Sequence, residues 1–571
     1  MNLRRALLVS SVILSLLGVT LTLLWVGCSG VAVKKMYTRG ALSTVSPLAT
    51  QVGERIFARG GNAIDVAVAT AFALSVVYPP AGNIGGGGFA LVRNGKTGEI
   101  VSLDFRETAP AAADEKMFLD STGQVIPSAS TLGAKAAGVP GTVAGLHALW
   151  KKYGSLPWSD LVAPAVQHAE NGFVVNDKLA ERFAEDSARL RHFDETTEIF
   201  AHSGFPRAGD TLVQKDLGRT LRMIGSDGPD AFYRGEIAER IVACMQQHGG
   251  LITADDLAGY VTEWRQPLRF TFDSLEVVSM GPPSSGGICL GQMLKLIEPY
   301  SFGRWSPSSP EYVHLVCEAA RLSYADRATH LGDPAFYPVP DKLLDSAYLS
   351  SRRALIPKDR AGSSESVSAG YLSGRESSNT THISVADAKG NVVVLTYTLN
   401  DTFGSCLVVR GTGFLLNNEM DDFSIKPGVP NIYGLIGGEA NKIEPGKRML
   451  SSMAPTIILK QGRPLLALGT PGGSKIITTI AETVLNITRF HLSPPDAVAH
   501  ARFHHQWQPD VISFERGQHD YAPETKQALV QMGYRLDEKD PWGDVNLIAF
   551  EPSGVMLPVA DWRYGGRAGG Y

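Results

Sequence analysis

The sequence predicts an α+β protein in which a helix-rich part precedes a strand-rich part. The composition is globular, with 571 residues of which 44% are hydrophobic and 19% charged. Residues 146–345 alternate helical periodicity with glycine and proline breaks, whereas residues 381–399 carry the strongest strand pattern of the chain. The net charge of −4 provides no basic field for phosphate backbones, which excludes nucleic acid as an expected partner.

The first thirty residues are typical of an export segment. Arg4 and Arg5 precede an apolar run from Ala6 to Gly27, and Cys28 follows it. The run exceeds the usual signal core of about 7–15 residues and is long enough to cross a bilayer. Gly27-Cys28 also resembles the cleavage point of a bacterial lipoprotein signal. We expect an exported protein, periplasmic or otherwise extracytoplasmic, and both a lipid anchor and an uncleaved membrane anchor stay open.

A helix and a strand pair are predicted next. Residues 61–77 are rich in alanine and have no broad polar face, which predicts a well-buried helix. The glycine run 85–88 opens a strand at 89–92, and a turn leads to a second strand at 100–105. For the glycines, close backbone approach within a sheet is favoured over ligand contact.

Residues 146–345 are expected to be mostly helical, with amphipathic helices such as Val313–Ala328. The segment AGSSESVSAGYLSGRESSN, residues 361–379, is too poor in apolar residues to fold alone and predicts a linker or flexible loop. Four cysteines are far apart and form no C-x-x-C pair, so we expect small core residues and no disulfide framework: Cys244, Cys289, Cys317 and Cys406.

A hairpin after this linker brings two threonines together. If residues 388–390 form a three-residue loop with Gly390 in the left-handed conformation, Asp387 faces Asn391 and Thr380 lies opposite Thr398. Directly opposed side chains have Cβ atoms about 4.5–5.5 Å apart, so the two hydroxyls can meet. An ordinary cross-strand threonine pair satisfies this geometry as well.

The chemistry of threonine gives the pair a second interpretation. A hydroxyl is a weak nucleophile that needs a base, and a free α-amine on the same residue can supply one because its pKa lies near about 8. That requires cleavage before the threonine. The Asn379-Thr380 peptide bond is a suitable cleavage point, since a flexible segment that ends in a strand-initial threonine allows the hydroxyl to attack the preceding carbonyl. The chain is then expected to process itself.

The segment SNTTHISVADAKGNVVVLTYTLNDTFGS resembles the processing and nucleophile region of the γ-glutamyltransferases. The resemblance continues through most of the chain after the export segment, in the motifs GNAIDVAVATAFAL, NIGGGGF, LDFRETAP, AAGVPGTVAG, PPSSGG, EAARLSYADR, LLNNEMDDF, PGVPNIYGL, SSMAPTI, GTPGGSKIITT, ARFHHQW and RYGGRAGGY. It implies an N-terminal nucleophile hydrolase fold, a four-layer αββα sandwich. It also implies cleavage into a large subunit, residues 31–379, and a small subunit, residues 380–571, with Thr380 as nucleophile and Thr398 supporting it.

Pro471-Gly472-Gly473 matches the oxyanion hole of that family. Two successive glycine N–H groups before a helix that begins near Ser474 can point at one oxygen, and the helix dipole adds to their effect. A phosphate loop is disfavoured, because Ser474 stands where the Walker pattern requires glycine.

By the same resemblance, Arg106 with Ser451 and Ser452 takes the α-carboxylate of a glutamyl donor. A forked cation suits a carboxylate, and the α-amine needs acceptors. The resemblance assigns the amine to Asn400, Glu419 and Asp422. Residues 427–441, with Tyr433, resemble a lid loop over the site, which favours γ-glutamyl substrates over bulky acyl groups.

The expected reaction is attack by Thr380 on glutathione or a related γ-glutamyl compound, followed by transfer to water or to an amino acid or dipeptide acceptor. No cofactor and no metal are expected, and His500, His504 and His505 are interpreted as structural because no glutamate follows His500 as in a zincin. Two alternatives stay open: a glutaryl or cephalosporin-type acylase of the same fold, and an unprocessed surface binding protein.

Overall fold

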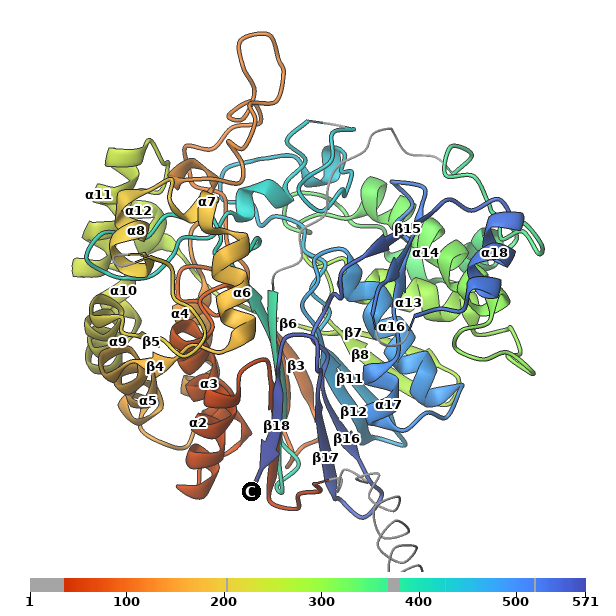
Figure 1. The fold of residues 1–571 in the computed structure, drawn as a ribbon, viewed down its shortest axis with the longest axis horizontal. Coiled ribbons are helices and arrows are strands. Elements are labelled where there is room, and N and C mark those ends of the chain that lie inside the picture. The colour runs from red at the N-terminus through yellow and green to blue at the C-terminus, as the bar shows by residue number, and fades with distance from the viewer. Residues whose placement is uncertain (1–34, 202–203, 368–379, 427, 518–519) are drawn as a thin grey trace, which may run out of the picture. The chain divides into compact units, whose positions relative to one another are not determined.

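Two β-sheets lie face to face, and helices cover the outer face of each (Figure 1). The computed structural model describes residues 35–201, 204–367, 380–426, 428–517 and 520–571. The layers confirm the expected α+β class and the four-layer αββα sandwich. The predicted export segment lies outside the described residues. Among the residues that are described, no helix is both long and apolar enough to cross a membrane.

The first sheet combines strands from both ends of the chain. Strands β9 and β10 occupy its centre. Its order is β18 (Arg567–Gly570), β1 (Gly40–Thr44), β9 (Thr380–Asp387), β10 (Val392–Thr398), β2 (Gly87–Arg93), β3 (Ile100–Phe105) and β6 (Glu263–Arg265). The strands that flank β9 and β10, which are β1 and β2, come from the part of the chain before the predicted cleavage point.

The second sheet also joins the two parts of the chain. Its order is β17 (Met556–Ala560), β16 (Asn546–Phe550), β12 (Arg463–Gly469), β11 (Thr456–Lys460), β8 (Leu275–Ser279) and β7 (Leu268–Phe272). An apolar layer that includes Leu91, Val394 and Ile457 is buried between the sheets. Two smaller sheets contain β4 (Phe173–Val174) with β5 (Thr211–Leu212), and β13 (Phe503–His504), β14 (Ile512–Glu515) and β15 (Leu536–Lys539).

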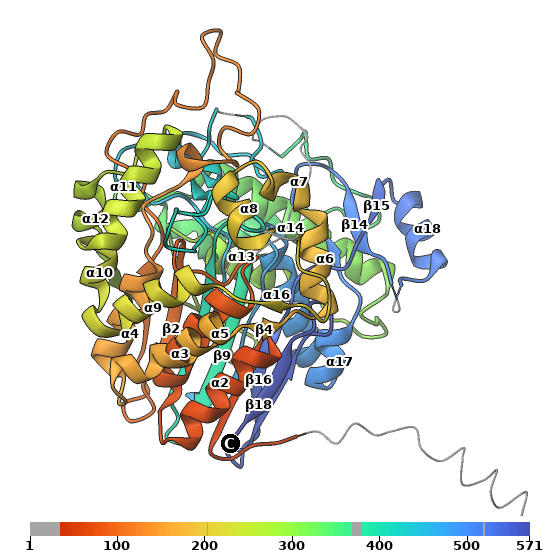
Figure 2. The same ribbon diagram turned by 60° about the vertical axis from the view of Figure 1, so that its left-hand side comes forward.

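Helices α2 and α3 cover the outer face of the first sheet (Figure 2), and α13 and α16 cover that of the second. The helices on the side of the first sheet are α2 (Pro47–Ala58), α3 (Ala63–Val77), α4 (Thr142–Tyr153), α5 (Trp158–Asn171), α6 (Asp177–Glu185), α7 (Ser187–Leu190), α8 (Asp194–Phe200), α9 (Lys215–Asp227), α10 (Pro229–Tyr233), α11 (Glu236–His248) and α12 (Ala254–Gly259). Those on the other side are α13 (Gly286–Ile297), α14 (Pro310–His330), α15 (Ser346–Arg353), α16 (Lys475–Thr488), α17 (Pro494–Ala499) and α18 (Pro523–Gln531).

Helix α3 confirms the predicted buried helix. All fifteen of its residues are buried, and Asn62 and Asp65 form a capping box at its start. The adjoining glycines also behave as expected. A Cβ on Gly86 would lie 2.0 Å from the carbonyl oxygen of Thr398, and one on Gly88 would lie 2.3 Å from that of Thr396. These glycines therefore allow β2 to lie directly against β10.

The hairpin of β9 and β10 has the predicted register. Thr380 pairs with Thr398, and Val392 pairs with Ala386. The N–H of Asp387 donates to the carbonyl oxygen of Asn391 at 3.1 Å, and Gly390 has φ of +82°. The structure therefore confirms the three-residue loop and the threonine pair that was predicted from it.

Residues 146–345 are mostly helical as predicted, but the helical interpretation missed five strands within them: the two-residue strands β4 and β5, and β6, β7 and β8. Residues 268–272 and 275–279 read LRFTF and LEVVS, and they pair as adjacent antiparallel strands. Both are short and rich in β-branched or aromatic residues, a signal that the surrounding helical periodicity obscured.

Helix α14 is buried rather than amphipathic. Its charged residues Glu318 and Arg321 are only 2% and 0% exposed, because Arg321 pairs with both Glu318 and Asp510. A charged residue at helical spacing therefore does not identify a solvent face when a partner neutralises it in the interior.

The predicted linker is anchored at its start. Within residues 361–367, the N–H of Gly362 donates to Glu318 at 3.0 Å and that of Ser364 donates to Asp510 at 3.0 Å. The indole of Trp507 also donates to the carbonyl oxygen of Ser364 at 3.0 Å. The expectation of a flexible loop is wrong for these residues, while 368–379 lie outside the described part of the chain.

Candidate active site

A small cavity of about 20 Å³ lies where β9 begins and β10 ends. It brings together residues that the sequence analysis drew from widely separated motifs. Its lining consists of Arg106, Thr380, Thr398, Asn400, Glu419, Asp422, Tyr433, Ser451, Ser452, Met453, Gly473 and Ile476. Of the remaining predicted residues, Gly472 adjoins Gly473 without lining the cavity, and Asn379 lies outside the described residues.

The two threonine hydroxyls face each other in this cavity. Their Oγ1 atoms are 3.5 Å apart, and Thr380 is only 4% exposed. Thr398 Oγ1 accepts a hydrogen bond from the N–H of Asn400 at 2.8 Å. That bond fixes the Thr398 hydroxyl beside Thr380, which starts the strand.

Gly472 and Gly473 form a tight turn before α16. Their φ angles are +140° and +55°, in the region that favours glycine. Their carbonyl oxygens accept the N–H groups of Lys475 and Ile476, which begins the helix. Within the described residues, the N–H groups of both glycines donate to no protein acceptor. Two donors and the positive end of a helix dipole are therefore available to an oxygen at this turn.

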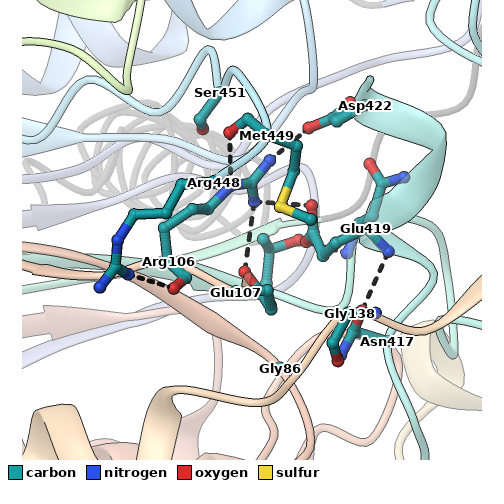
Figure 3. Close-up of polar contacts among 12 residues, drawn as sticks. Gly86, Arg106, Glu107, Gly138, Asn417, Glu419, Asp422, Arg448, Met449 and Ser451 are labelled. Carbon is teal, nitrogen blue, oxygen red and sulfur yellow. Dashed lines mark hydrogen bonds and ion pairs between the residues drawn. The ribbon is translucent and has the colours of Figure 1, made fainter. Parts of the chain in front are cut away.

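Arg106 occupies the centre of a buried acidic cluster (Figure 3). Its guanidinium nitrogens lie 2.6 Å from Glu419 Oε2, 2.5 Å from Asp422 Oδ2 and 3.6 Å from Glu107 Oε2. Nε also donates to the carbonyl oxygen of Met449 at 3.3 Å. The structure thus joins the residues expected at the carboxylate end of a donor to those expected at its amine end.

The carboxyls of this cluster hold their protons more tightly than ordinary carboxyls do. Burial raises the pKa of Glu107 to about 7, although Arg106 opposes the shift. Burial also raises the pKa of Glu419 well above its ordinary value, and Glu107 and Asp422 add to that shift while Arg106 opposes it. Burial likewise raises the pKa of Asp422. The cause is common to all three, since three buried carboxyls share one guanidinium.

The predicted lid residue Tyr433 closes one side of the cavity. Its hydroxyl donates to the carbonyl oxygen of Asn400, and its ring packs on Gly473, where an added Cβ would lie 2.4 Å from Tyr433 Cδ1. Asn431, two residues earlier, donates to Asp422 Oδ1 at 3.0 Å. The loop is therefore attached to both ends of the site.

Sequence reasoning missed two residues that shape the cluster: Glu107 and Asn431. Glu107 follows Arg106 directly at the end of a buried strand, and it is 0% exposed. Its position just after a largely buried strand was the signal available, because a carboxylate there has little access to water. Asn431 had no comparable signal, since it contacts Asp422 only through the folded loop.

The predicted structural histidines have protein partners. His504 Nδ1 lies 2.8 Å from Thr478 Oγ1, and His505 Nε2 lies 3.1 Å from Asp510 Oδ1. His500 Nδ1 lies 2.8 Å from the carbonyl oxygen of Ala501. In the described ranges of the chain, no three His, Cys, Asp or Glu side chains are grouped as a metal site requires. The four predicted core cysteines are buried and unpaired.

Comparison with known proteins gives consistent matches over most of the chain. A family model described as gamma-glutamyltranspeptidase matches residues 49–571. The glutathione hydrolase proenzyme of Escherichia coli K12 is 44% identical over 92% of this chain and 90% of its own, and that of Pseudomonas aeruginosa PAO1 is 46% identical over 91% and 92%. The crystal structure of cephalosporin acylase from Bacillus halodurans is similar with a TM-score of 0.81, at 27% identity, and covers 94% of this chain and 96% of that one.

Proposed function

Since the chain belongs to the gamma-glutamyltranspeptidase family and is a self-processing γ-glutamyltransferase, we propose that Thr380 is its nucleophile and Asn379-Thr380 its cleavage site. One observation carries the assignment. Thr380 starts β9 and faces, within a single small cavity, both the glycine turn and the Arg106 cluster. A nucleophile, an oxyanion site and a charged recognition site are the parts that acyl transfer requires.

Self-cleavage begins with attack by Thr380 Oγ1 on the carbonyl carbon of Asn379. The C–N bond breaks, the nitrogen of Thr380 becomes a free amine, and an ester joins the two residues. Water then hydrolyses the ester, which leaves a carboxylate on Asn379 and restores the hydroxyl. The fragments 31–379 and 380–571 stay together because both sheets contain strands from each of them.

The free α-amine of Thr380 is the base in turnover, because its pKa lies near about 8. It takes the hydroxyl proton as Oγ1 attacks the γ-carbonyl of the donor, and Gly472 and Gly473 N–H groups stabilise the oxyanion. The proton passes to the leaving amine, and an acyl-enzyme forms. Water or the amine of an acceptor then attacks the acyl group and regenerates Thr380. The chain supplies the nucleophile, the base and the oxyanion donors of this cycle.

The zwitterionic end of a glutamyl donor fits the polar wall of the cavity. Arg106, Ser451 and Ser452 are proposed to bind its α-carboxylate, while Glu419, Asp422 and the side-chain oxygen of Asn400 accept from its ammonium. The existing ion pairs between Arg106 and the two acids support this arrangement. A donor with one negative and one positive group can insert between them without changing the net charge of the site.

Glutathione and related γ-glutamyl compounds are the proposed donors, and amino acids or dipeptides the proposed acceptors. The names of the two relatives described above support the donor class. Export of the chain, with a lipid or membrane anchor at residues 1–30, is likewise a proposal that rests on the sequence alone.

Donor discrimination tests this function against an acylase of the same fold. A glutaryl anilide keeps the carboxylate of the donor and lacks its amine. We expect kcat/KM for the γ-glutamyl anilide to exceed that for the glutaryl anilide by at least about tenfold, because one charge-assisted hydrogen bond to a carboxylate contributes about 1.5–3 kcal/mol. Steady-state rates with both anilides measure the ratio. A preference for the glutaryl compound would assign the chain to the acylases instead.

The ratio of the two rates should also depend on pH. Because burial raises the pKa of Glu107 to about 7 and also raises the pKa of Glu419 and of Asp422, these carboxyls take up protons as the pH falls, and neutral carboxyls attract an ammonium poorly. The preference for the γ-glutamyl anilide should therefore decline as the pH falls from about 8 to about 5. Titration of the Thr380 amine affects both substrates equally and cancels in the ratio. A ratio that is constant over this range contradicts the assignment of the acids.

A further inference from the structure

A buried arginine lies behind the cavity and has no role in the mechanism above. Arg327 belongs to α14, within the motif EAARLSYADR, and is only 4% exposed. In the part of the chain that the structure describes, no carboxylate lies within ion-pair distance of it. Burial lowers its pKa, as expected for a cation that is removed from water without a close counter-ion. Asp422 opposes this shift without forming a direct ion pair with Arg327, so the guanidinium keeps positive charge that an anionic ligand could use.

The contacts of Arg327 lead to the two serines that line the cavity. Its Nη2 donates to Ser452 Oγ at 3.4 Å, and its Nε donates to Ser285 Oγ at 2.9 Å. Ser285, from the motif PPSSGG, donates in turn to the carbonyl oxygen of Ser451 at 2.6 Å. The Arg327 guanidinium therefore contacts the side chain of Ser452 directly and, through Ser285, the backbone of Ser451.

These contacts determine where the hydroxyl proton of Ser452 can point. An arginine can only donate, so Ser452 Oγ accepts from it and directs its own O–H elsewhere. Since Ser452 lines the cavity, its O–H can donate to an anion bound there. Arg327 itself does not line the cavity and acts through Ser452.

Arg106 alone leaves little positive potential for an incoming carboxylate. Three carboxyls, those of Glu107, Glu419 and Asp422, already lie within 3.6 Å of its guanidinium. A second cation near the same wall can offset that negative charge. Arg327 is the candidate, since no ion pair neutralises it within the described residues.

We propose that Arg327 is a positioning residue for the α-carboxylate of the donor, which orients the Ser452 hydroxyl and adds positive charge behind it. The proposal rests on the function proposed above. In this proposal Ser285 of the motif PPSSGG and Arg327 of the motif EAARLSYADR both contribute to donor binding.

Three anilide donors separate this role from a merely structural one. The γ-glutamyl and glutaryl anilides carry the carboxylate, whereas the 4-aminobutyryl anilide keeps the amine and lacks the carboxylate. In Arg327→Met we expect kcat/KM to fall by at least about tenfold for the first two donors and to change less than about twofold for the third. In a Ser452→Ala background, the same substitution should lower kcat/KM for the two carboxylate donors by a smaller factor than in the wild type, because the hydroxyl that it positions is gone and only its charge remains to act.

Two further variants complete the test. Arg352→Met removes another cation, which pairs with Asp326 at 2.8 Å, and should leave the pattern over the three donors unchanged. Arg327→Lys retains the positive charge but cannot donate to both Ser285 and Ser452. We expect a smaller decrease in kcat/KM, confined to the two donors that carry the carboxylate. If Arg327→Met does not yield two fragments, this lysine variant provides the same comparison.

The outcomes distinguish the two proposals. If Arg327→Met lowers kcat/KM equally for all three donors, or for none of them, the role of Arg327 is overturned. The wild-type preference for γ-glutamyl donors would still support the proposed function. A wild-type enzyme without that preference would overturn the proposed function, and the role of Arg327 with it.

Discussion

Thr380→Ala should remain a single unbroken chain and lose at least about 10⁴-fold in turnover of a γ-glutamyl anilide. The substitution removes the oxygen that attacks Asn379 and the donor, so both reactions stop together. Within the described residues, the one side-chain hydrogen bond that it removes is the 3.5 Å contact with the Thr398 hydroxyl, so folding should be intact. A denaturing gel and a rate assay on the same preparation measure both effects.

The neighbouring threonine provides a matched control. Thr381 is buried in the same strand, and its Oγ1 makes no hydrogen bond within the described part of the protein. Thr381→Val, which keeps the shape of the side chain, should therefore process and turn over normally. Thr380→Ser retains a hydroxyl and an α-amine and should still be cleaved. Normal turnover by Thr380→Ala would remove this residue from the mechanism.

Gly473→Ala should reduce kcat by about 10²–10³-fold, the effect of losing an oxyanion donor. The residue has φ of +55°, and the new methyl would lie 2.4 Å from the ring of Tyr433. The turn must therefore shift, and its N–H groups with it. Single-turnover rates on processed enzyme measure the change in the chemical step.

Two variants test whether the loss of kcat comes from the place of Gly473 beside the cavity or from backbone strain at any glycine. Gly462, in the turn between β11 and β12, has φ of +75° with no atom near its added Cβ, so Gly462→Ala introduces similar strain far from the cavity. We expect its activity to be unchanged. Adding Tyr433→Ala to Gly473→Ala makes room for the methyl and should recover part of kcat. Full activity in Gly473→Ala alone would contradict the proposed oxyanion site.

The sequence was most informative where local chemistry determines geometry. A three-residue loop with a left-handed glycine at Gly390 predicted the pairing of Thr380 with Thr398, and the structure confirms both the loop and the register. Helix α3 was predictable for a similar reason, because a helix without a broad polar face must be buried.

Tertiary neutralisation of charge could not be predicted from the sequence. Arg321 and Glu318 have the spacing of a solvated helix face, but they are buried because Asp510 and Ser364, distant in sequence, complete their contacts. The cluster around Arg106 is similar. The resemblance assigned Arg106 and the acids to opposite ends of a donor, whereas the structure places Glu419 and Asp422 directly on the guanidinium. Such pairs depend on loops that the fold alone brings together.

The mass of the purified, active wild-type protein tests the central claim most directly. The proposed mechanism requires an unblocked amine on Thr380, so intact-mass measurement with N-terminal sequencing should find a fragment spanning Thr380–Tyr571 in stoichiometric amount with the remainder of the chain. An active preparation in which the Asn379–Thr380 peptide bond is unbroken would contradict the account.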